Sequence, residues 1–142
     1  MKLGRSFLAG PHLDDEIIRL RWYVRESDDV LVGKIWFGPG AQGPPGHAHG
    51  GSMAAVLDEA LGSSCWVAGH GVVAAELTTK FRNMLPLGEV VTAEAWVDRT
   101  DGRKIHPRGR IVGDDGTVYA EATGLFIELD RGKFEALAGQ IE

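Results

Sequence analysis

One helical segment near the middle of the 142-residue chain constrains the fold more than any other feature. The pattern predicts a helix from about Ser52 to Ala68, ended by Gly69-His70-Gly71. Its apolar face recurs at helical spacing and comprises Met53, Val56, Leu57, Ala60, Leu61 and Ser64. Small residues fill much of its remaining surface, where a solvated helix would carry Lys or Glu. Because small side chains let other backbone approach closely, we expect this helix to be packed on most of its sides.

Every periodic segment after this helix alternates like a β-strand. The predicted strands are Val72–Met84, Glu89–Asp98, Arg103–Val112 and Thr117–Leu129, with an earlier strand at Val30–Phe37. Short turns at residues 86–88, 100–102 and 114–116 join the four later strands, and Asp-Gly in the last two is a strong hairpin signal. A short helix is predicted at Lys133–Ala138. A four-strand antiparallel meander holding one helix is an α+β arrangement.

The first 29 residues are predicted to form a helical extension. Leu13, Ile17, Leu20 and Val24 have helical spacing, so the helix would run from His12 to about Glu26. The N-terminus has no apolar run typical of a signal peptide, and no segment approaches the roughly 20 apolar residues of a membrane span. We therefore expect a single cytoplasmic domain over residues 1–142, with no membrane partner.

Composition excludes several kinds of function. A formal net charge of −5 argues against general nucleic-acid binding, which requires a basic surface. Cys65 is the one cysteine, so no intrachain disulfide can form, and no His-Cys arrangement supports a nucleophilic thiol. His47 and His49 have no further ligand at a convincing spacing, so no metal site is expected.

The segment before and within the central helix reads GPPGHAHGGSMAAVLDEA from Gly43 to Ala60. A glycine-rich loop, His-Gly-Gly, a small-residue helix and an acid in its second turn resemble the hotdog thioesterase superfamily, in its PaaI-like and THEM4-like branch. The order and spacing of later strands also match, so the resemblance covers roughly residues 30–128. It implies a hotdog fold, an antiparallel sheet wrapped around a central α-helix.

The resemblance implies hydrolysis of an acyl-CoA thioester to a free acid and CoA, with coenzyme A present as part of the substrate and no other cofactor. Backbone N–H groups of Gly50 and Gly51 at the helix N-terminus would stabilise the oxyanion. In the family, the acid at Asp58 comes from one subunit and faces the glycines of the other, as a base or nucleophile. Glu59 lies on the opposite margin of the helix as the alternative acid, and His49 is expected to orient the loop.

The resemblance also implies that the CoA phosphates meet basic residues near strand ends, which favours Arg82, Arg103 and Lys104. The strand over 103–112 also places cations on one face; these are Lys104, Arg108 and Arg110, with His106 beside them. Such a stripe suits a phosphate-rich ligand. A solvated strand face explains it equally well.

Two positions depart from the family pattern. Gly43 stands where many relatives have Asn, and the segment from Val73 to Glu76 lacks their Ser or Thr. Gln42, His47 and Glu76 are the candidates to replace those polar groups. The departures keep open a structural or partner-binding module that has lost activity. A non-catalytic acyl-CoA-binding or sensor protein with the same fold is a separate alternative. A hotdog hydratase is disfavoured, because Ser63 stands where that class has a His.

Two further expectations concern assembly and the acyl pocket. The resemblance implies a homodimer, or a dimer of dimers, because the hotdog active site lies between subunits. Four aromatic residues are candidates to line a pocket for the acyl chain, although core packing is their commoner role; they are Trp36, Phe37, Trp66 and Phe81.

Overall fold

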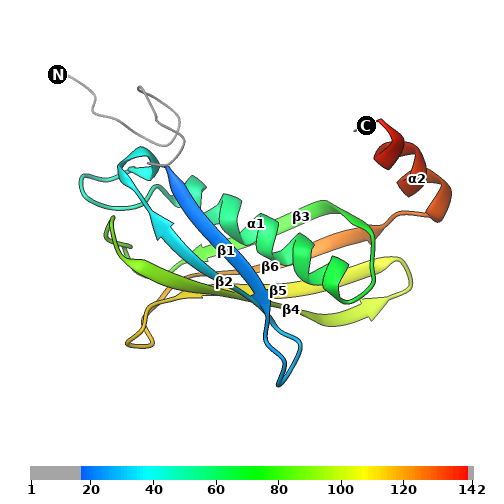
Figure 1. The fold of residues 1–142 in the computed structure, drawn as a ribbon, viewed down its shortest axis with the longest axis horizontal. Coiled ribbons are helices and arrows are strands. Elements are labelled where there is room, and N and C mark those ends of the chain that lie inside the picture. The colour runs from blue at the N-terminus through cyan, green and yellow to red at the C-terminus, as the bar shows by residue number, and fades with distance from the viewer. Residues whose placement is uncertain (1–16, 141–142) are drawn as a thin grey trace.

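The computed structural model describes residues 17–140, which form one six-stranded antiparallel sheet and two α-helices (Figure 1). The strands are β1 Ile18–Val24, β2 Leu31–Phe37, β3 Val72–Phe81, β4 Val90–Asp101, β5 Lys104–Val112 and β6 Val118–Glu128. The helices are α1 Gly50–Val67 and α2 Arg131–Gly139, with a 3₁₀ turn at Pro39–Ala41. The strand order across the sheet is β1-β2-β4-β5-β6-β3. The predicted α+β class and hotdog architecture are confirmed.

The two Asp-Gly turns form hairpins as predicted. Gly102 (φ 58°) turns β4 into β5, and Gly116 (φ 87°) lies in the turn between β5 and β6. Both need a left-handed backbone conformation that glycine adopts without strain. Strands β4, β5 and β6 therefore make a three-strand meander.

The predicted four-strand meander is wrong in its first strand. Strand β3 pairs antiparallel with β6, from Val72 opposite Glu128 to Phe81 opposite Ala120, and it forms one edge of the sheet. The Pro86-Leu87-Gly88 segment is a crossover and not a hairpin turn. It is fixed to the loop before α1, because the Leu87 N–H donates to the Gly46 carbonyl and residue 86 bridges to His47.

The predicted N-terminal helix is also wrong where it falls on described residues. Residues 18–24 form β1, which pairs with β2 over its whole length, whereas residues 12–16 lie outside the described part. Ile18, Leu20 and Trp22 are half-buried and alternate with exposed neighbours, which is a two-residue period. The Trp22 ring lies directly on Gly33 of β2, where no Cβ would fit. This packing decides in favour of a strand.

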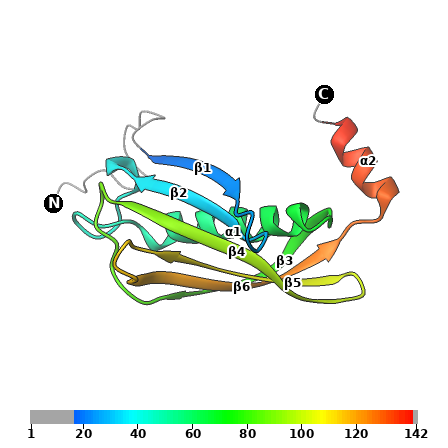
Figure 2. The same cartoon turned by 60° about the horizontal axis from the view of Figure 1, so that its bottom comes forward.

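Helix α1 lies in the concave side of the curved sheet (Figure 2). Leu61 of α1 is fully buried against β5 and β6, and each of these strands has a glycine at the point of contact. A Cβ on Gly109 of β5 would lie 2.8 Å from Leu61 Cδ1, and one on Gly124 of β6 would lie 3.1 Å from Leu61 Cδ2. These glycines let the helix approach the sheet closely, which fixes the position of its N-terminus.

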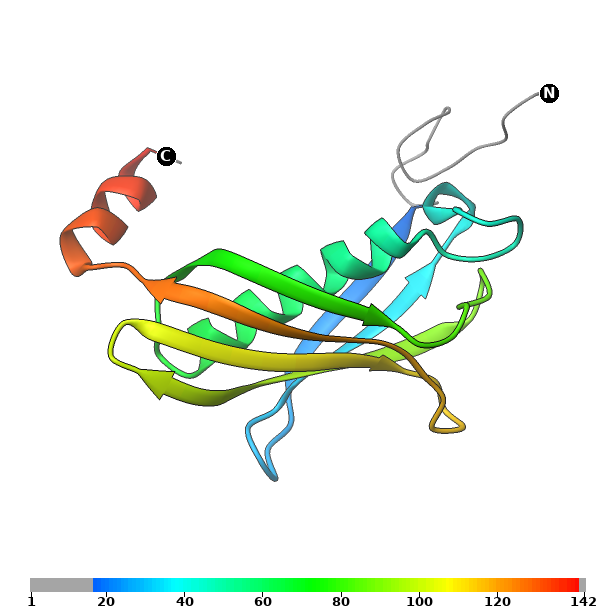
Figure 3. The same cartoon turned by 180° about the vertical axis from the view of Figure 1, so that it is seen from behind.

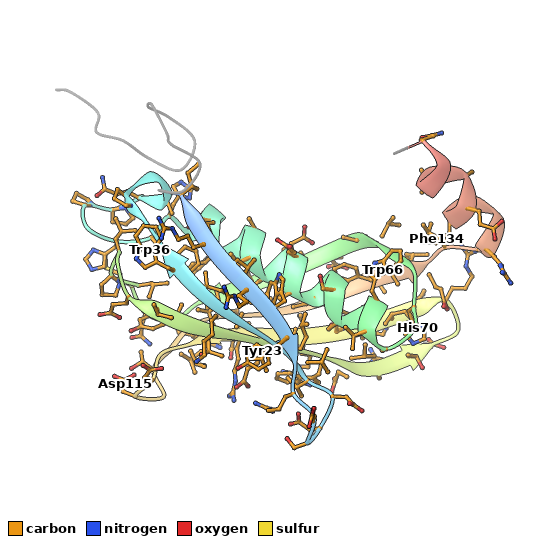
Figure 4. The ribbon with its side chains drawn as sticks, viewed as in Figure 1. Tyr23, Trp36, Trp66, His70, Asp115 and Phe134 are labelled. Atoms are coloured by element: carbon orange, nitrogen blue, oxygen red, sulfur yellow. The ribbon has the colours of Figure 1, made fainter. Side chains whose placement is uncertain are left out.

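Helix α2 follows β6 and stands apart from the sheet, on the side of the β3 edge (Figure 3). Its Phe134 ring lies 5.0 Å from the Trp66 ring at the C-terminal end of α1, and both are labelled in Figure 4. No helix between residues 17 and 140 is long and apolar enough to cross a bilayer.

Candidate active site

His49 caps the N-terminus of α1. Its Nδ1 accepts a hydrogen bond of 2.8 Å from the Gly51 N–H, and its carbonyl accepts one of 2.6 Å from Ser52 Oγ. Because Nδ1 is an acceptor, the proton of the neutral ring is on Nε2. The cap satisfies a backbone donor that a helix N-terminus otherwise leaves unpaired.

The two glycines predicted to supply N–H groups are therefore not equivalent. The Gly51 N–H is engaged by His49, whereas the Gly50 N–H has no hydrogen-bond partner among residues 17–140. The positive end of the α1 dipole also lies at this position. Gly50 is thus the donor within this chain that is available to an incoming carbonyl oxygen.

The loop before α1 packs so closely against His49 that it excludes a side chain at residue 43. A Cβ on Gly43 would lie 2.7 Å from His49 Cα, and the His49 N–H donates to the Ala41 carbonyl at 2.7 Å. The asparagine that many relatives have at this position would not fit here without a backbone shift. The departure noted in the sequence thus has a steric reason.

The neighbouring polar candidates, Gln42 and His47, hold the same loop. Gln42 Oε1 accepts from the Gly46 N–H at 3.0 Å. His47 Nδ1 lies 2.9 Å from the Pro45 carbonyl oxygen, and because a carbonyl only accepts, Nδ1 of His47 carries the proton. The Nε2 atom of His47 is then an acceptor.

An open groove of about 250 Å³ lies beside Gly50. Its wall is mainly apolar, and its lining residues are Pro44, His47, Ala48, Gly50, Met53, Phe81, Arg82, Asn83 and Met84. Met84 is 57% exposed, although it is a large apolar side chain. The sequence did not single out Asn83 or Met84 as site residues, because both fall inside the predicted strand Val72–Met84. Strand β3 ends at Phe81, and the residues after it line the groove.

Of the four aromatic residues considered for an acyl pocket, Phe81 alone lines this groove. Phe37 is fully buried in the core. Trp36 carries the Arg19 guanidinium 5.1 Å from its ring centroid, and Trp66 packs against Phe134 (Figure 4).

The two acids of α1 lie on opposite margins of the helix. Glu59 faces β1, where its Oε1 accepts a 3.4 Å hydrogen bond from Trp22 Nε1. Asp58 is exposed and makes no side-chain hydrogen bond or ion pair with any described residue. It is eight residues from Gly50, or about 12 Å along the helix axis. Asp58 therefore cannot reach a carbonyl bound at Gly50 of its own chain.

The basic candidates fall at two ends of the molecule. Arg82 lines the groove beside Gly50, and its Nε donates to Glu121 Oε1 at 3.1 Å, which holds the pKa of that carboxyl below its usual value. Arg103 donates to the Glu128 carbonyl near the C-terminal end of α1, and Lys104 is next to it. Since α1 is about 27 Å long, one chain brings Arg82 together with Gly50 but not Arg103 or Lys104.

The basic stripe lies on the outer face of the sheet, away from α1. Burial alternates along β5 as predicted, with Ile105, Pro107, Gly109 and Ile111 turned inward. Arg110 forms an ion pair with Glu94 at 3.2 Å, and Arg108 lies 4.0 Å from Asp98. Charged hollows on this face include one of about 260 Å³, and Glu76 lines a second. The sheet separates them, and hence Glu76, from Gly50.

Cys65 is a core thiol. It is fully buried, and burial raises its pKa to about 11. A thiol with a raised pKa is a poor nucleophile at neutral pH. Among residues 17–140, no three His, Cys, Asp or Glu side chains come together as metal ligands.

The sequence and the fold of this chain are similar to those of known proteins. The acyl-coenzyme A thioesterase THEM4 of Xenopus laevis is 40% identical over 108 residues, covering 75% of this chain and 49% of that protein. The BH2602 protein of Bacillus halodurans, solved with CoA, is 27% identical, with a TM-score of 0.67 and coverage of 77% of this chain and 73% of that one. The Escherichia coli PaaI protein shares the fold, at 21% identity, a TM-score of 0.66 and coverage of 70% and 72%.

The THEM4 match bears out the resemblance to the THEM4-like branch of hotdog proteins, and the PaaI protein shares the fold. The chain spans about half the length of the curated relatives it matches. The family model described as the thioesterase superfamily matches residues 45–120, more than half of the chain. That segment includes the His49 cap, Gly50 and Asp58, and on this match the chain belongs to the thioesterase superfamily.

Proposed function

We propose that this chain is an acyl-CoA thioesterase, which hydrolyses a thioester to a free acid and CoA. The observation that carries the proposal is the Gly50 N–H, which lies at the N-terminus of an 18-residue helix and has no hydrogen-bond partner in the described part of the chain. It opens into a mainly apolar groove. A thioester oxygen that accepts from this N–H is stabilised as it gains negative charge. The names of THEM4 and THEM5 relatives and the CoA-bound Bacillus halodurans structure support the same substrate class.

The proposed reaction uses Asp58 as the second group. As a general base, Asp58 takes a proton from water while the water oxygen bonds to the thioester carbon. The oxyanion held at Gly50 then collapses, the C–S bond breaks, and the CoA sulfur leaves with a proton returned to it. As a nucleophile, Asp58 would instead form an anhydride that water hydrolyses in a second step.

A second copy of the chain is required, because Asp58 lies too far from Gly50 of its own helix. We propose that two copies associate through the flank of α1 that carries Asp58 and through β3. That flank has small residues at Gly51, Ala54 and Gly62, and β3 is the neighbouring edge strand, largely exposed along its length. An exposed strand edge with unpaired N–H and C=O groups is a ready site for pairing. Pairing of such dimers into a dimer of dimers is the further expectation.

The remaining proposals concern the contacts of the CoA moiety and the cellular location. Arg82 at the groove is the proposed contact for a CoA phosphate, with Arg103 and Lys104 supplied from elsewhere in the assembly. Gln42 and His47 hold the loop beside it. We keep the cytoplasm as the proposed compartment, because the one cysteine is a buried free thiol.

Release of free thiol from a panel of acyl-CoAs tests the proposal. We expect wild-type turnover, a large loss in Asp58→Asn, and near-normal activity in Glu59→Gln, which is the matched control on the adjacent residue. Loss of both general-base and nucleophile roles should lower kcat by at least about 100-fold. Binding of acyl-CoA without any hydrolysis would refute the enzyme, and loss of activity in Glu59→Gln alone would refute the choice of acid.

Mixing two inactive variants tests whether the site is shared. Asp58→Asn keeps the Gly50 donor, whereas Gly50→Val blocks the groove and keeps the acid. Hybrid dimers have one complete site if each site takes one group from each chain. Mixing the variants should then restore about a quarter of wild-type activity, because half of the dimers are hybrids with one of two sites intact. No recovery in confirmed hybrids would contradict a shared site.

The second candidate, a non-catalytic acyl-CoA-binding protein, is favoured by one observation. The close packing of Gly43 on His49 leaves no room for the polar side chain that many relatives have there. Such a protein would bind acyl-CoA at the same groove without releasing thiol. The turnover panel above therefore separates the two candidates.

A further inference from the structure

The ring of Phe81 lies against the N-terminus of α1, where the Gly50 N–H has no hydrogen-bond partner among residues 17–140. A Cβ built on Gly50 would lie 3.3 Å from Phe81 Cζ and 3.4 Å from Cε1. That Cβ would be bonded to the same Cα as the amide nitrogen, so the tip of the ring borders the position of a carbonyl bound there. Any group attached to that carbonyl on the Phe81 side must pass the ring.

The register of the sheet holds Phe81 in this position. It is the last residue of β3 and pairs with the buried Ala120 of β6, so its side chain is on the α1 side of the sheet. The wall of the groove is mainly apolar and includes Ala48, Met53 and Met84, whereas His47, Arg82 and Asn83 supply its polar part. An apolar wall matches the hydrocarbon of the acyl group better than the amides of the CoA arm. The acyl carbon next to the carbonyl is then the atom nearest to the Phe81 ring.

We infer that Phe81 determines acyl specificity by accepting substrates that are unbranched at the carbon next to the thioester carbonyl and excluding those branched there. The inference rests on the proposed function, since it places the carbonyl at Gly50. A methyl branch on that carbon would occupy the space of the Phe81 ring. A branch one carbon further along would lie in the open groove between Met53 and Met84.

The expected change in kcat/KM follows from the free energy that one methyl group contributes at the wall of a hydrophobic pocket. A misplaced or missing methylene changes kcat/KM by about 10- to 200-fold in hydrophobic pockets. Butyryl-CoA and isobutyryl-CoA have the same number of carbons and differ in this branch, so they are the matched pair. Wild type should prefer butyryl-CoA within that range and should accept isovaleryl-CoA at a rate close to that of valeryl-CoA.

The experiment compares the butyryl to isobutyryl ratio of kcat/KM in wild type and Phe81→Ala. Tyr23→Ala is the control, because Tyr23 is an aromatic residue of similar exposure, 47% against 54% for Phe81, and lies on β1 at the opposite edge of the sheet. We expect the ratio to fall at least about tenfold in Phe81→Ala and to stay unchanged in the control. Phe81→Leu, which keeps an apolar side chain, should be intermediate. Size-exclusion chromatography checks that every variant keeps the wild-type assembly.

Three results would overturn the inference, and they are distinguishable. Wild type that hydrolyses both substrates equally, or a ratio unaffected by Phe81→Ala, refutes the specificity role while leaving the thioesterase intact. An equal rise in KM for every substrate in Phe81→Ala, with weaker inhibition by free CoA, shows that the groove holds the CoA arm. Wild type without turnover of any acyl-CoA refutes the proposed function itself.

Discussion

Substitution of Gly109 by alanine tests how closely α1 must sit on the sheet. The new Cβ would lie 2.8 Å from Leu61 Cδ1 and 2.9 Å from the Glu94 carbonyl oxygen. The first contact can be relieved only by moving a fully buried side chain, and the second involves backbone. Overpacking of this kind costs about 1–3 kcal/mol. For a domain of this size each kcal/mol lowers Tm by about 3–4 °C, so we expect a Tm lower by about 3–12 °C.

Urea unfolding and thermal melting measure this cost against Gly71→Ala. A Cβ on Gly71 would make ordinary contacts, 3.5 Å from Phe134 and 3.7 Å from Trp66, so this control should be neutral or more stable by about 0.4–1 kcal/mol. Leu61→Ala alone should cost about 2–5 kcal/mol, and in that background Gly109→Ala should cost less, because one of its two clashes is gone. Equal stability of the two glycine variants, or an unchanged cost beside Leu61→Ala, would refute the packing argument.

Two further predictions concern the helix N-terminus and the core thiol. His49→Ala should lower the free energy of unfolding by about 0.5–2 kcal/mol through loss of the cap, and His49→Asn, which keeps an acceptor, should restore most of it in urea titrations. Cys65 should not react with a thiol reagent at pH 8 until urea unfolds the protein. Burial raises the pKa of the Cys65 thiol from 9.0 to about 11. The stability that the buried neutral thiol contributes should therefore be lost as pH rises from 9 to 11. Rapid labelling of native protein, or a Cys65→Ser variant with the same alkaline loss, would contradict this.

The sequence predicted elements whose evidence is local. The helix at α1 and the hairpins around Gly102 and Gly116 were correct, because an apolar face of helical period and an Asp-Gly turn each act over a few residues. Strand β1 was missed because seven residues can satisfy both a helical and an alternating spacing. Contact of Trp22 with Gly33, a distant residue in sequence, decides between them. The pairing of β3 with β6 was missed for the same reason, because a Pro-Leu-Gly segment occurs both in hairpin turns and in crossover connections.

The candidate site shows the same division. The motif located Gly50 and Asp58, but it treated Gly50 and Gly51 as equal donors. Only the orientation of the His49 ring shows that the Gly51 N–H is already bonded. Likewise the sequence named Phe81 among four aromatics, and the strand register was needed to place its ring beside Gly50.

The eight-residue separation of Gly50 and Asp58 also says where the proposed interface must lie. Gly50, Ala54 and Asp58 are four residues apart and follow one ridge of α1. A two-fold axis that brings Asp58 of each chain to Gly50 of its partner relates the two helices antiparallel, and it must pass near the midpoint of the separation, at Ala54. Two helices can approach closely there because Ala54 has no side chain beyond Cβ. A small residue at position 54 and an eight-residue separation of Gly50 from Asp58 are therefore both required if two symmetric copies are to share their active sites.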